Sequence, residues 1–266
     1  MARRENPDFV EAIERGLEVI RAFGVSGGGL SLTEVAEATG LPRPTARRVL
    51  VTLESLGYVR MENRVFRLTP RVLELGVAYV ASLDVWDVVR PHLQTLVSRT
   101  HESSSMAQLD GAEIVYVGRV AVPKIVTIAV NVGTRMPAAA TSMGRVLLAA
   151  LPPAELAAAL AAEPRSDVDP RAVPDPARLE EILAETRERG WTIVDQDLAV
   201  GVRSVAAPVH DQEGGTVAAV NICVQAAEHG IDELAEAFLP QLLETAETIS
   251  GELAQRAQIP QVVLPV

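Results

Sequence analysis

Apolar residues in the first third of the chain recur at helical spacing, in segments separated by glycines. Over residues 9–20 they repeat every three or four positions, which predicts an amphipathic helix that ends near Gly24. Ser31 and Glu34 have the spacing of a capping box, and Gly40 is a typical residue at a helix end. A second, short helix is therefore predicted between Ser31 and Gly40.

A third helix is predicted directly after this turn. Pro42 lies where a first helical turn tolerates a missing N–H group, and Gly57 ends the pattern. The positions expected to face inward are Val49, Leu50, Leu53 and Leu56. Two helices joined by a short turn around Gly40 make a helix-turn-helix.

Basic residues occupy the positions at which such a unit contacts DNA. The third helix begins with arginines and a threonine on its exposed side, and a recognition helix presents its N-terminal residues to base edges. Residues 58–68 form a predicted hairpin, or wing, that turns at Glu62 and Asn63 and whose arginines would flank the duplex backbone. The residues that we expect to contact DNA are Arg43, Pro44, Thr45, Arg47, Arg48, Arg60, Arg64 and Arg67.

Charge is distributed unevenly along the chain, whose net charge is -11. Residues 1–80 hold 11 Arg and 10 acidic residues, whereas residues 81–266 hold 13 basic and 25 acidic residues. A nearly neutral first domain with its arginines on one surface is compatible with DNA binding. A single arginine on a helix is more often a solvated charge, and some helix-turn-helix units bind protein. The ordered combination of capped helix, glycine turn, arginine-rich helix and wing is what favours double-stranded DNA.

The remaining residues predict an α+β domain, in which helices flank an antiparallel sheet. Asp110 and Gly111 give a strong hairpin signal between two alternating segments. We expect strands at 104–109, 113–120, 125–130, 192–194, 204–209 and 216–224. We expect helices at 85–97, 142–151, 156–162, 179–189 and 232–257.

The last predicted strand has two different faces. One face is wholly apolar, whereas Asn221 and Cys223 bring polar groups to the other, as in a ligand pocket. Ser142, Met143 and Gly144 would open a helix, whose free N–H groups and dipole favour an anion such as a carboxylate. The alternatives are that Cys223 is a small buried hydrophobe and that Asn221 only satisfies neighbouring backbone groups.

Other chemistry finds little support in the sequence. Arg145 and Arg203 are most simply surface or packing charges, although either could counter an acidic ligand. The four histidines lack metal-ligand spacing: His92, His101, His210 and His229. No nucleophile elbow, phosphate-binding loop, dinucleotide fingerprint or zinc-protease motif is present. We therefore expect no catalytic residue, no metal and no cofactor.

Two stretches resemble the IclR family of bacterial transcription regulators, and the resemblance covers nearly the whole chain. Residues 31–59 are similar to the helix-turn-helix of the family, and residues 190–222 to its C-terminal signature. The signature is matched at Gly190, Ser204, Val205, Ala206, Val209, His210 and Asp211. Val194 stands where the family prefers Asp or Ser, and Asp197 where it prefers Glu.

The resemblance implies a winged helix-turn-helix, a linker helix and a GAF-like effector-binding domain, assembled into homodimers that pair into tetramers. Residues 115–120 and 203–206 look closest to the branch that regulates catabolism of protocatechuate, 4-hydroxybenzoate and β-ketoadipate. Positions that match the family's effector pocket are Ile125, Ser142, Met143, Ser204, Asn221 and Cys223, with Gly144 in the same helix start.

We therefore predict a DNA-binding domain over residues 1–69, a linker helix over 70–82, an effector-binding domain over 83–258 and a tail over 259–266. The predicted function is regulation of a catabolic operon, with operator DNA and a small carboxylate, either an aromatic acid or a dicarboxylate, as partners. A sensory or scaffold module whose helix-turn-helix binds protein is the alternative, followed by an enzyme. No apolar segment of the chain reaches the about 18 residues that a membrane span requires. The chain has a single cysteine, which cannot form an internal disulfide, and we therefore expect a cytoplasmic protein.

Overall fold

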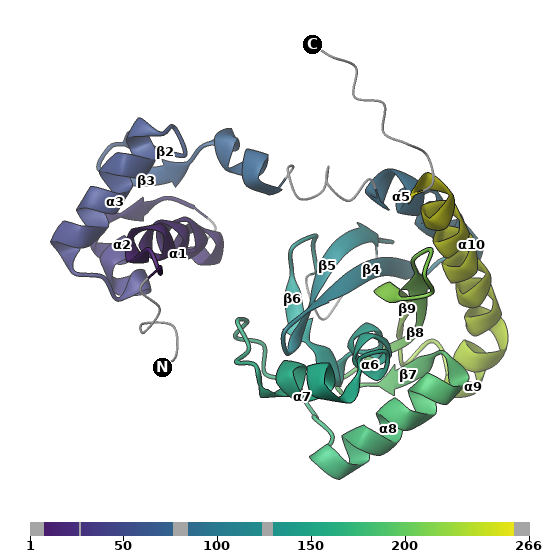
Figure 1. Cartoon of the computed structure of the whole chain (residues 1–266). Coiled ribbons are helices and arrows are strands. Elements are labelled where there is room, and N and C mark those ends of the chain that lie inside the picture. The colour runs from purple at the N-terminus through teal and green to yellow at the C-terminus, as the bar shows by residue number, and fades with distance from the viewer. Residues whose placement is uncertain (1–7, 27, 77–84, 124–129, 258–266) are drawn as a thin grey trace. The chain divides into compact units, whose positions relative to one another are not determined.

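The computed structural model describes residues 8–26, 28–76, 85–123 and 130–257. The chain divides into two compact units, residues 1–82 and 83–266, which we call the head and the body (Figure 1). The head and the body each have a hydrophobic core of their own. The predicted fold class is confirmed, because a winged helix-turn-helix precedes an α/β domain with an antiparallel sheet.

Among its described residues, the head combines helices with a three-stranded antiparallel sheet of order β1-β3-β2. Its elements are α1 (Glu11–Ser26), β1 (Leu30–Ser31), α2 (Leu32–Thr39), α3 (Arg43–Ser55), β2 (Val59–Glu62), β3 (Val65–Leu68) and the short 3-10 helix η2 (Pro70–Val72). The predicted capping box is present, since Glu34 N donates to Ser31 Oγ at 3.3 Å and Ser31 N donates to Glu34 Oε2 at 2.7 Å. Gly40 ends α2 with φ of +65°, a left-handed conformation that glycine adopts readily.

Some details of the head differ from the prediction. The wing turns at Asn63 and Arg64, both with positive φ, because Glu62 still pairs with Val65 across the hairpin. Leu56 was expected to face inward but is 52% exposed, since it lies after the last residue of α3. Strand β1 was not predicted, because two residues carry no periodic pattern. Of the predicted linker helix, residues 70–76 are helical, and the rest lies outside the described residues.

Helix α1 has two apolar faces, of which only one enters the core of the head. Val19 and Phe23 are buried against α2 and α3, whereas Ile13 and Leu17 are 62% and 51% exposed. The two residues just before α1 extend this exposed face, and we call Phe9, Val10, Ile13 and Leu17 together the exposed apolar stripe of α1.

The described residues of the body form a six-stranded antiparallel sheet of order β6-β5-β4-β9-β8-β7 with helices on it. Its strands are β4 (Ser103–Asp110), β5 (Glu113–Val120), β6 (Arg135–Pro137), β7 (Thr192–Asp195), β8 (Val202–His210) and β9 (Thr216–Gln225). Its helical segments are α5 (Val85–Thr100), η3 (Ala138–Ala140), α6 (Ser142–Ala149), α7 (Pro153–Ala161), α8 (Pro176–Arg189), α9 (Ile231–Glu233), the π-helical segment η4 (Leu234–Phe238) and α10 (Leu239–Ala257).

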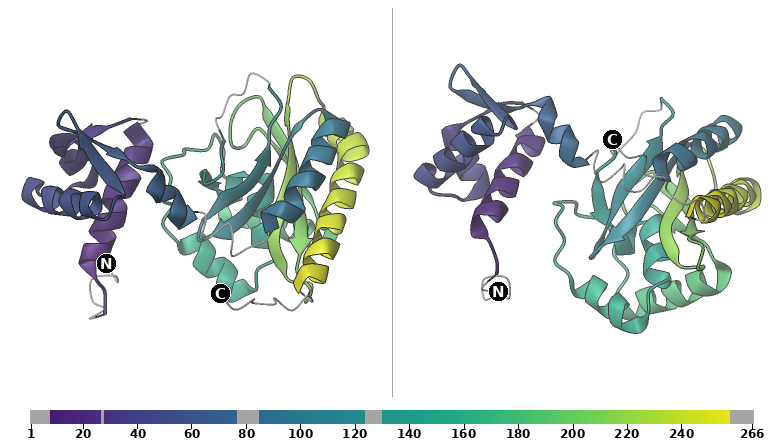
Figure 2. Two further views of the ribbon diagram at one scale, coloured as in Figure 1. Left: turned by 90° about the horizontal axis from the view of Figure 1, so that it is seen from above. Right: turned by 45° about the horizontal axis from the view of Figure 1, so that its top comes forward.

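Helices cover both faces of this sheet. Helices α5 and α10 lie side by side on one face, and α6 packs on the other with α7 and α8 around it (Figure 2). Val220 and Ile222 contribute to the core under α10, whereas Ala206 and Ala219 contribute to the core under α6. Strand β6 was not predicted, and the predicted strand at 125–130 falls almost wholly outside the described residues.

Candidate functional site

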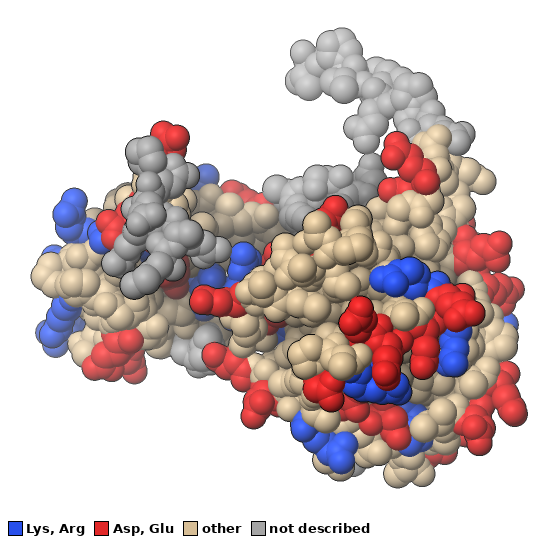
Figure 3. Space-filling view, turned by 60° about the horizontal axis from the view of Figure 1, so that its bottom comes forward, with Lys and Arg blue, Asp and Glu red and all other residues tan. Residues whose placement is uncertain are grey.

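The start of helix α3 presents basic side chains to solvent. Ala46 and Leu50 point into the core of the head, which leaves Arg43, Arg47 and Arg48 exposed. Pro44 is exposed beside them and Thr45 is half-buried. Among the described residues, none of these three arginines has an acidic partner. Figure 3 shows Arg side chains along one edge of the head, while the visible face of the body carries many Asp and Glu side chains.

The wing carries three more exposed arginines. Arg60 lies directly opposite Arg67 in the hairpin, and Glu62 lies between their charges, 3.3 Å from Arg60 Nε and 3.8 Å from Arg67 Nε. Arg64 is in the turn at the tip of the hairpin. All three side chains are exposed, as contact with a nucleic acid backbone requires.

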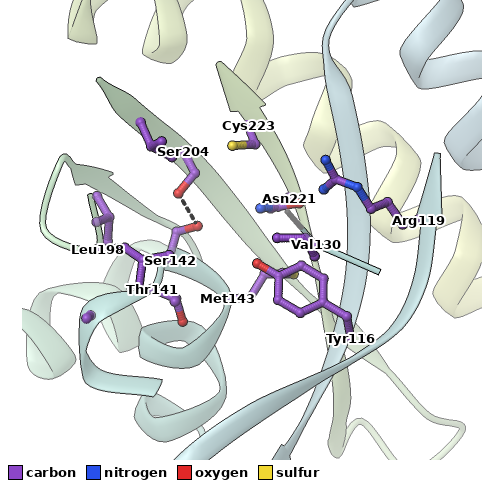
Figure 4. A pocket seen from close by; sticks show the side chains of 13 residues that line it. Tyr116, Arg119, Val130, Thr141, Ser142, Met143, Leu198, Ser204, Asn221 and Cys223 are labelled. Carbon is purple, nitrogen blue, oxygen red and sulfur yellow. Dashed lines mark hydrogen bonds between the residues drawn. The ribbon is translucent and has the colours of Figure 1, made fainter. Parts of the chain in front are cut away.

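The body holds a pocket between the start of α6 and the sheet (Figure 4). The pocket opens to solvent, and its lining is mostly apolar with a few polar side chains, which is the composition of a small-molecule site. Five of the predicted effector-binding residues line it: Ser142, Met143, Ser204, Asn221 and Cys223. Gly144 is buried in α6 but does not line the pocket, and Ile125 lies outside the described residues.

Eight residues outside that predicted set also line the pocket: Tyr116, Arg119, Val130, Ala140, Thr141, Val194, Leu198 and Val202. Regular strand alternation would put Tyr116 and Arg119 on opposite faces of β5. The register with β4 shifts between Met106 and Ala107, which leaves Val117 as an extra residue in β5. Tyr116 and Arg119 consequently line the same pocket, and a bulge of this kind leaves no clear signal in a single sequence.

Hydrogen bonds fix several polar side chains of the pocket. Ser142 Oγ and Ser204 Oγ are 2.8 Å apart and share a hydrogen bond. Asn221 Oδ1 accepts from Ser105 N at 3.0 Å, and Arg119 Nη1 donates to Ser105 Oγ at 3.1 Å. The pocket therefore combines an apolar wall with oriented polar groups.

Arg145 and Arg203 do not line the pocket. Arg145 Nη2 lies 2.5 Å from Asp197 Oδ2, and Arg203 Nε donates to Asp195 Oδ1 at 2.7 Å. The Arg203 hydrogen bond holds the pKa of Asp195 below its usual value. Arg145 thus tethers the loop between β7 and β8, which carries the lining residue Leu198, whereas Arg203 joins the adjacent ends of these two strands. The simpler interpretation of these two charges, a packing role, agrees with the geometry.

Two further features could take part in chemistry: the thiol of Cys223 and a cluster of two glutamates and a histidine. Burial raises the pKa of the Cys223 thiol to about 11, so the thiol stays protonated and unreactive near neutral pH. The described residues bring Glu102, Glu228 and His229 together, with one potential ligand atom of each within 4.8 Å of the others. His229 Nε2 is bonded to Glu102 Oε1 at 3.0 Å, so this nitrogen already has a protein partner.

Gly144 allows the close contact that positions the start of α6. A Cβ atom there would lie 2.1 Å from the backbone oxygen of Ala138. We expect Gly144→Ala to lower the free energy of unfolding of the body by about 1–3 kcal/mol, because η3 and α6 must separate. Gly251→Ala in α10 is the matched control: nothing lies within 4 Å of that position, and about 0.5–1 kcal/mol of stabilisation is expected. Denaturant unfolding measures both, and two variants of equal stability would contradict the contact.

A head with a winged helix-turn-helix and exposed arginines on α3, together with a body that holds a pocket open to solvent, is typical of one class of protein, the effector-responsive DNA-binding regulators. Residues 12–62 match the model of the IclR helix-turn-helix domain, and residues 77–251 match that of the bacterial transcriptional regulator IclR C-terminal domain. The chain belongs to the IclR family. It is thus a transcription regulator and not an enzyme.

Individual relatives extend over almost the whole chain. The Pca regulon regulatory protein of Pseudomonas putida is 36% identical over 93% of this chain and 86% of its own length. A crystal structure of a transcriptional regulator from Rhodococcus sp. RHA1 is 46% identical, with a TM-score of 0.80 over 93% of this chain and 100% of that one. An IclR homologue from Microbacterium hydrocarbonoxydans, crystallised with 4-hydroxybenzoate, is 25% identical, with a TM-score of 0.79 over 93% and 100% of the two chains.

Within the part of the chain that the structure describes, no helix combines the length and the apolar character that crossing a membrane requires.

Proposed function

We propose that this regulator controls an operon for the catabolism of an aromatic acid and responds to a small aromatic carboxylate bound in the pocket of the body. The observation that carries the proposal is the charge of the pocket: Arg119 lines it, and no described lining residue is acidic. Val194, at a position where the family prefers Asp or Ser, is part of that uncharged wall. A carboxylate therefore meets a cation without a repelling anion.

Relatives support an aromatic acid over other acids. The similarity to the Pca regulon regulatory protein and to a homologue crystallised with 4-hydroxybenzoate favours this class. A dicarboxylate is the second candidate, because the free N–H groups at the start of α6 provide a second place for negative charge. Ile125 stays a proposed pocket residue on the family resemblance alone.

Calorimetry and thermal unfolding with 4-hydroxybenzoate, protocatechuate and adipate test the effector class. At least one of the aromatic acids should bind with a stoichiometry of one molecule per chain. At a free concentration of 100 times its Kd, it should raise the free energy of unfolding of the body by about 2.7 kcal/mol. Binding of adipate alone would favour the dicarboxylate. Binding of none of the three would contradict the proposal.

We propose that the head reads operator DNA as one half of a symmetric dimer. Arg43, Pro44, Thr45, Arg47 and Arg48 would enter the major groove, and the wing arginines, Arg60, Arg64 and Arg67, would contact the phosphate backbone. A dimer matches a palindromic operator, because two-fold protein symmetry requires two equivalent half-sites. The cytoplasm remains the proposed location, since operator DNA lies there.

The exposed apolar stripe of α1 supports the dimer. Its four side chains lie on a surface that would otherwise remain in water, and a second copy of the same helix offers a matching apolar surface. Pairing of dimers into tetramers is the further assembly that we propose from the family resemblance.

We expect Ile13→Glu with Leu17→Glu to dissociate the dimer of heads and to weaken operator binding. Light scattering of the wild type should give at least twice the chain mass of 28.4 kDa. Leu56→Glu is the control, because Leu56 is also exposed but lies outside the stripe and after the last residue of α3. If the wild type were monomeric at micromolar concentration, or if the double variant kept full operator affinity, the proposed dimer contact would be wrong.

A further inference from the structure

Arg119 is the feature of the pocket with the most unused hydrogen-bonding capacity. It is half-buried on β5, and its hydrogen bond among the described residues is the one from Nη1 to Ser105 Oγ. The remaining N–H groups of its guanidinium have no partner within the described residues. In Figure 4 the guanidinium points toward the space beside Asn221 and Cys223. A partly desolvated cation without an acidic partner is a strong site for an anionic ligand.

Asn221 supplies a second unpaired donor. The residue is 5% exposed. Its Oδ1 accepts a hydrogen bond from Ser105 N, which fixes the orientation of the amide because the amide nitrogen cannot accept one. Its Nδ2 has no hydrogen-bond partner among the described residues and points into the pocket (Figure 4). Among the described residues, every side-chain nitrogen or oxygen that is fully buried has a hydrogen-bond partner. Asn221 Nδ2 has none, so it is not fully buried, and a solvent molecule or a ligand can contact it from the pocket.

A neutral polar pair lies elsewhere on the pocket wall. Ser142 and Ser204 share one hydrogen bond, which uses one of the two hydroxyl protons and leaves the other, together with oxygen lone pairs, for a ligand. Thr141 Oγ1 already accepts from Gly144 N at 3.1 Å, so part of the helix start is occupied by its own cap. Among the described lining residues, Arg119 is thus the charged group, and the Ser142–Ser204 pair is an uncharged hydrogen-bonding site.

We propose that the pocket holds its acid in one orientation, with the carboxylate on Arg119 and Asn221 Nδ2, and with an oxygen at the opposite end of the ligand on the Ser142 and Ser204 hydroxyls. The apolar body of the ligand packs against Met143 and Val130, which lie between these two ends of the pocket (Figure 4). This inference rests on the proposed function and specifies it: the ligand class is an acid with a second polar group across the ring. In this orientation the carboxylate is not over the start of α6, where the sequence predicted it.

Three probes separate the two ends of the ligand in calorimetry: 4-hydroxybenzoate, benzoate, which lacks the hydroxyl, and 4-hydroxybenzyl alcohol, which lacks the carboxylate. Arg119→Gln should weaken 4-hydroxybenzoate and benzoate by about 10- to 100-fold and leave 4-hydroxybenzyl alcohol nearly unchanged. Ser204→Ala should weaken 4-hydroxybenzoate by about 3- to 10-fold and leave benzoate unchanged. Arg99→Gln, on the exposed side of α5, is the matched control and should change none of them.

The outcomes that would overturn the orientation are distinct from failure of the proposed function. Equal loss of all three probes in Arg119→Gln, or loss of benzoate binding in Ser204→Ala, would place the carboxylate elsewhere. Unchanged 4-hydroxybenzoate binding in Arg119→Gln would overturn the orientation alone. If the wild type bound none of the probes, both the aromatic effector and the orientation would fail. Unchanged thermal unfolding of the ligand-free variants shows that folding is not the cause.

Discussion

Replacing Arg47 and Arg48 together with alanine is expected to weaken specific operator binding by about 2–6 kcal/mol, at least about 30-fold. Both side chains are exposed in the first half of α3, and neither has an acidic partner among the described residues, so their full charge is available to DNA. Neither contributes to the core of the head, and the free energy of unfolding should change by less than about 0.5 kcal/mol.

Fluorescence anisotropy at fixed salt, with the operator and a scrambled duplex, measures this loss. The matched control is Arg60→Ala with Arg67→Ala in the wing, which should weaken both duplexes alike and reduce the dependence of affinity on salt. Full, unaltered operator affinity of the α3 double variant would remove the assignment of α3 as the recognition helix.

Glu113→Gln is expected to lower the free energy of unfolding of the body by about 3 kcal/mol at neutral pH. The side chain is 1% exposed and accepts hydrogen bonds from the backbone N–H groups of Arg165 and Ser166, from Ser166 Oγ and from Arg135 Nε. Burial opposes ionisation, but these hydrogen bonds outweigh it and lower the pKa from 4.5 to about 2. Glu113 thereby ties the segment between α7 and α8 to the β5 strand.

The pH dependence has a definite sign. A lowered pKa in the folded protein means that the stabilisation is complete above about pH 4.5 and is lost as the pH falls toward about 2. Denaturant unfolding at several pH values should show the difference between wild type and Glu113→Gln shrinking over that range. Glu163→Gln, in the same segment but exposed, should behave like the wild type. A constant difference at every pH would show that ionised Glu113 is not the stabilising form.

Local signals predicted the helix-turn-helix well. The capping box at Ser31, the left-handed Gly40 and the start of α3 after Pro42 depend on neighbouring residues, and the structure contains all three. The polar face of β9 was predicted for the same reason, because strand alternation alone separates Asn221 from Ile222.

Features that depend on distant residues were missed. The place of Arg119 in the pocket depends on a bulge against β4, and the ion pair of Arg145 with Asp197 joins residues 52 positions apart. The exposed stripe of α1 was equally beyond prediction, because helical periodicity shows that a face is apolar and not what covers it.

Coupling between effector and operator tests the central claim most directly. Operator affinity should be measured by anisotropy with and without a saturating aromatic acid identified by calorimetry, and the affinity for that acid with and without operator. We predict a change of about tenfold or more in operator affinity, equivalent to about 1.4 kcal/mol, and a change in acid affinity by the same factor, because linkage is reciprocal. Identical operator affinity in the presence and absence of every acid that binds the pocket would contradict the account.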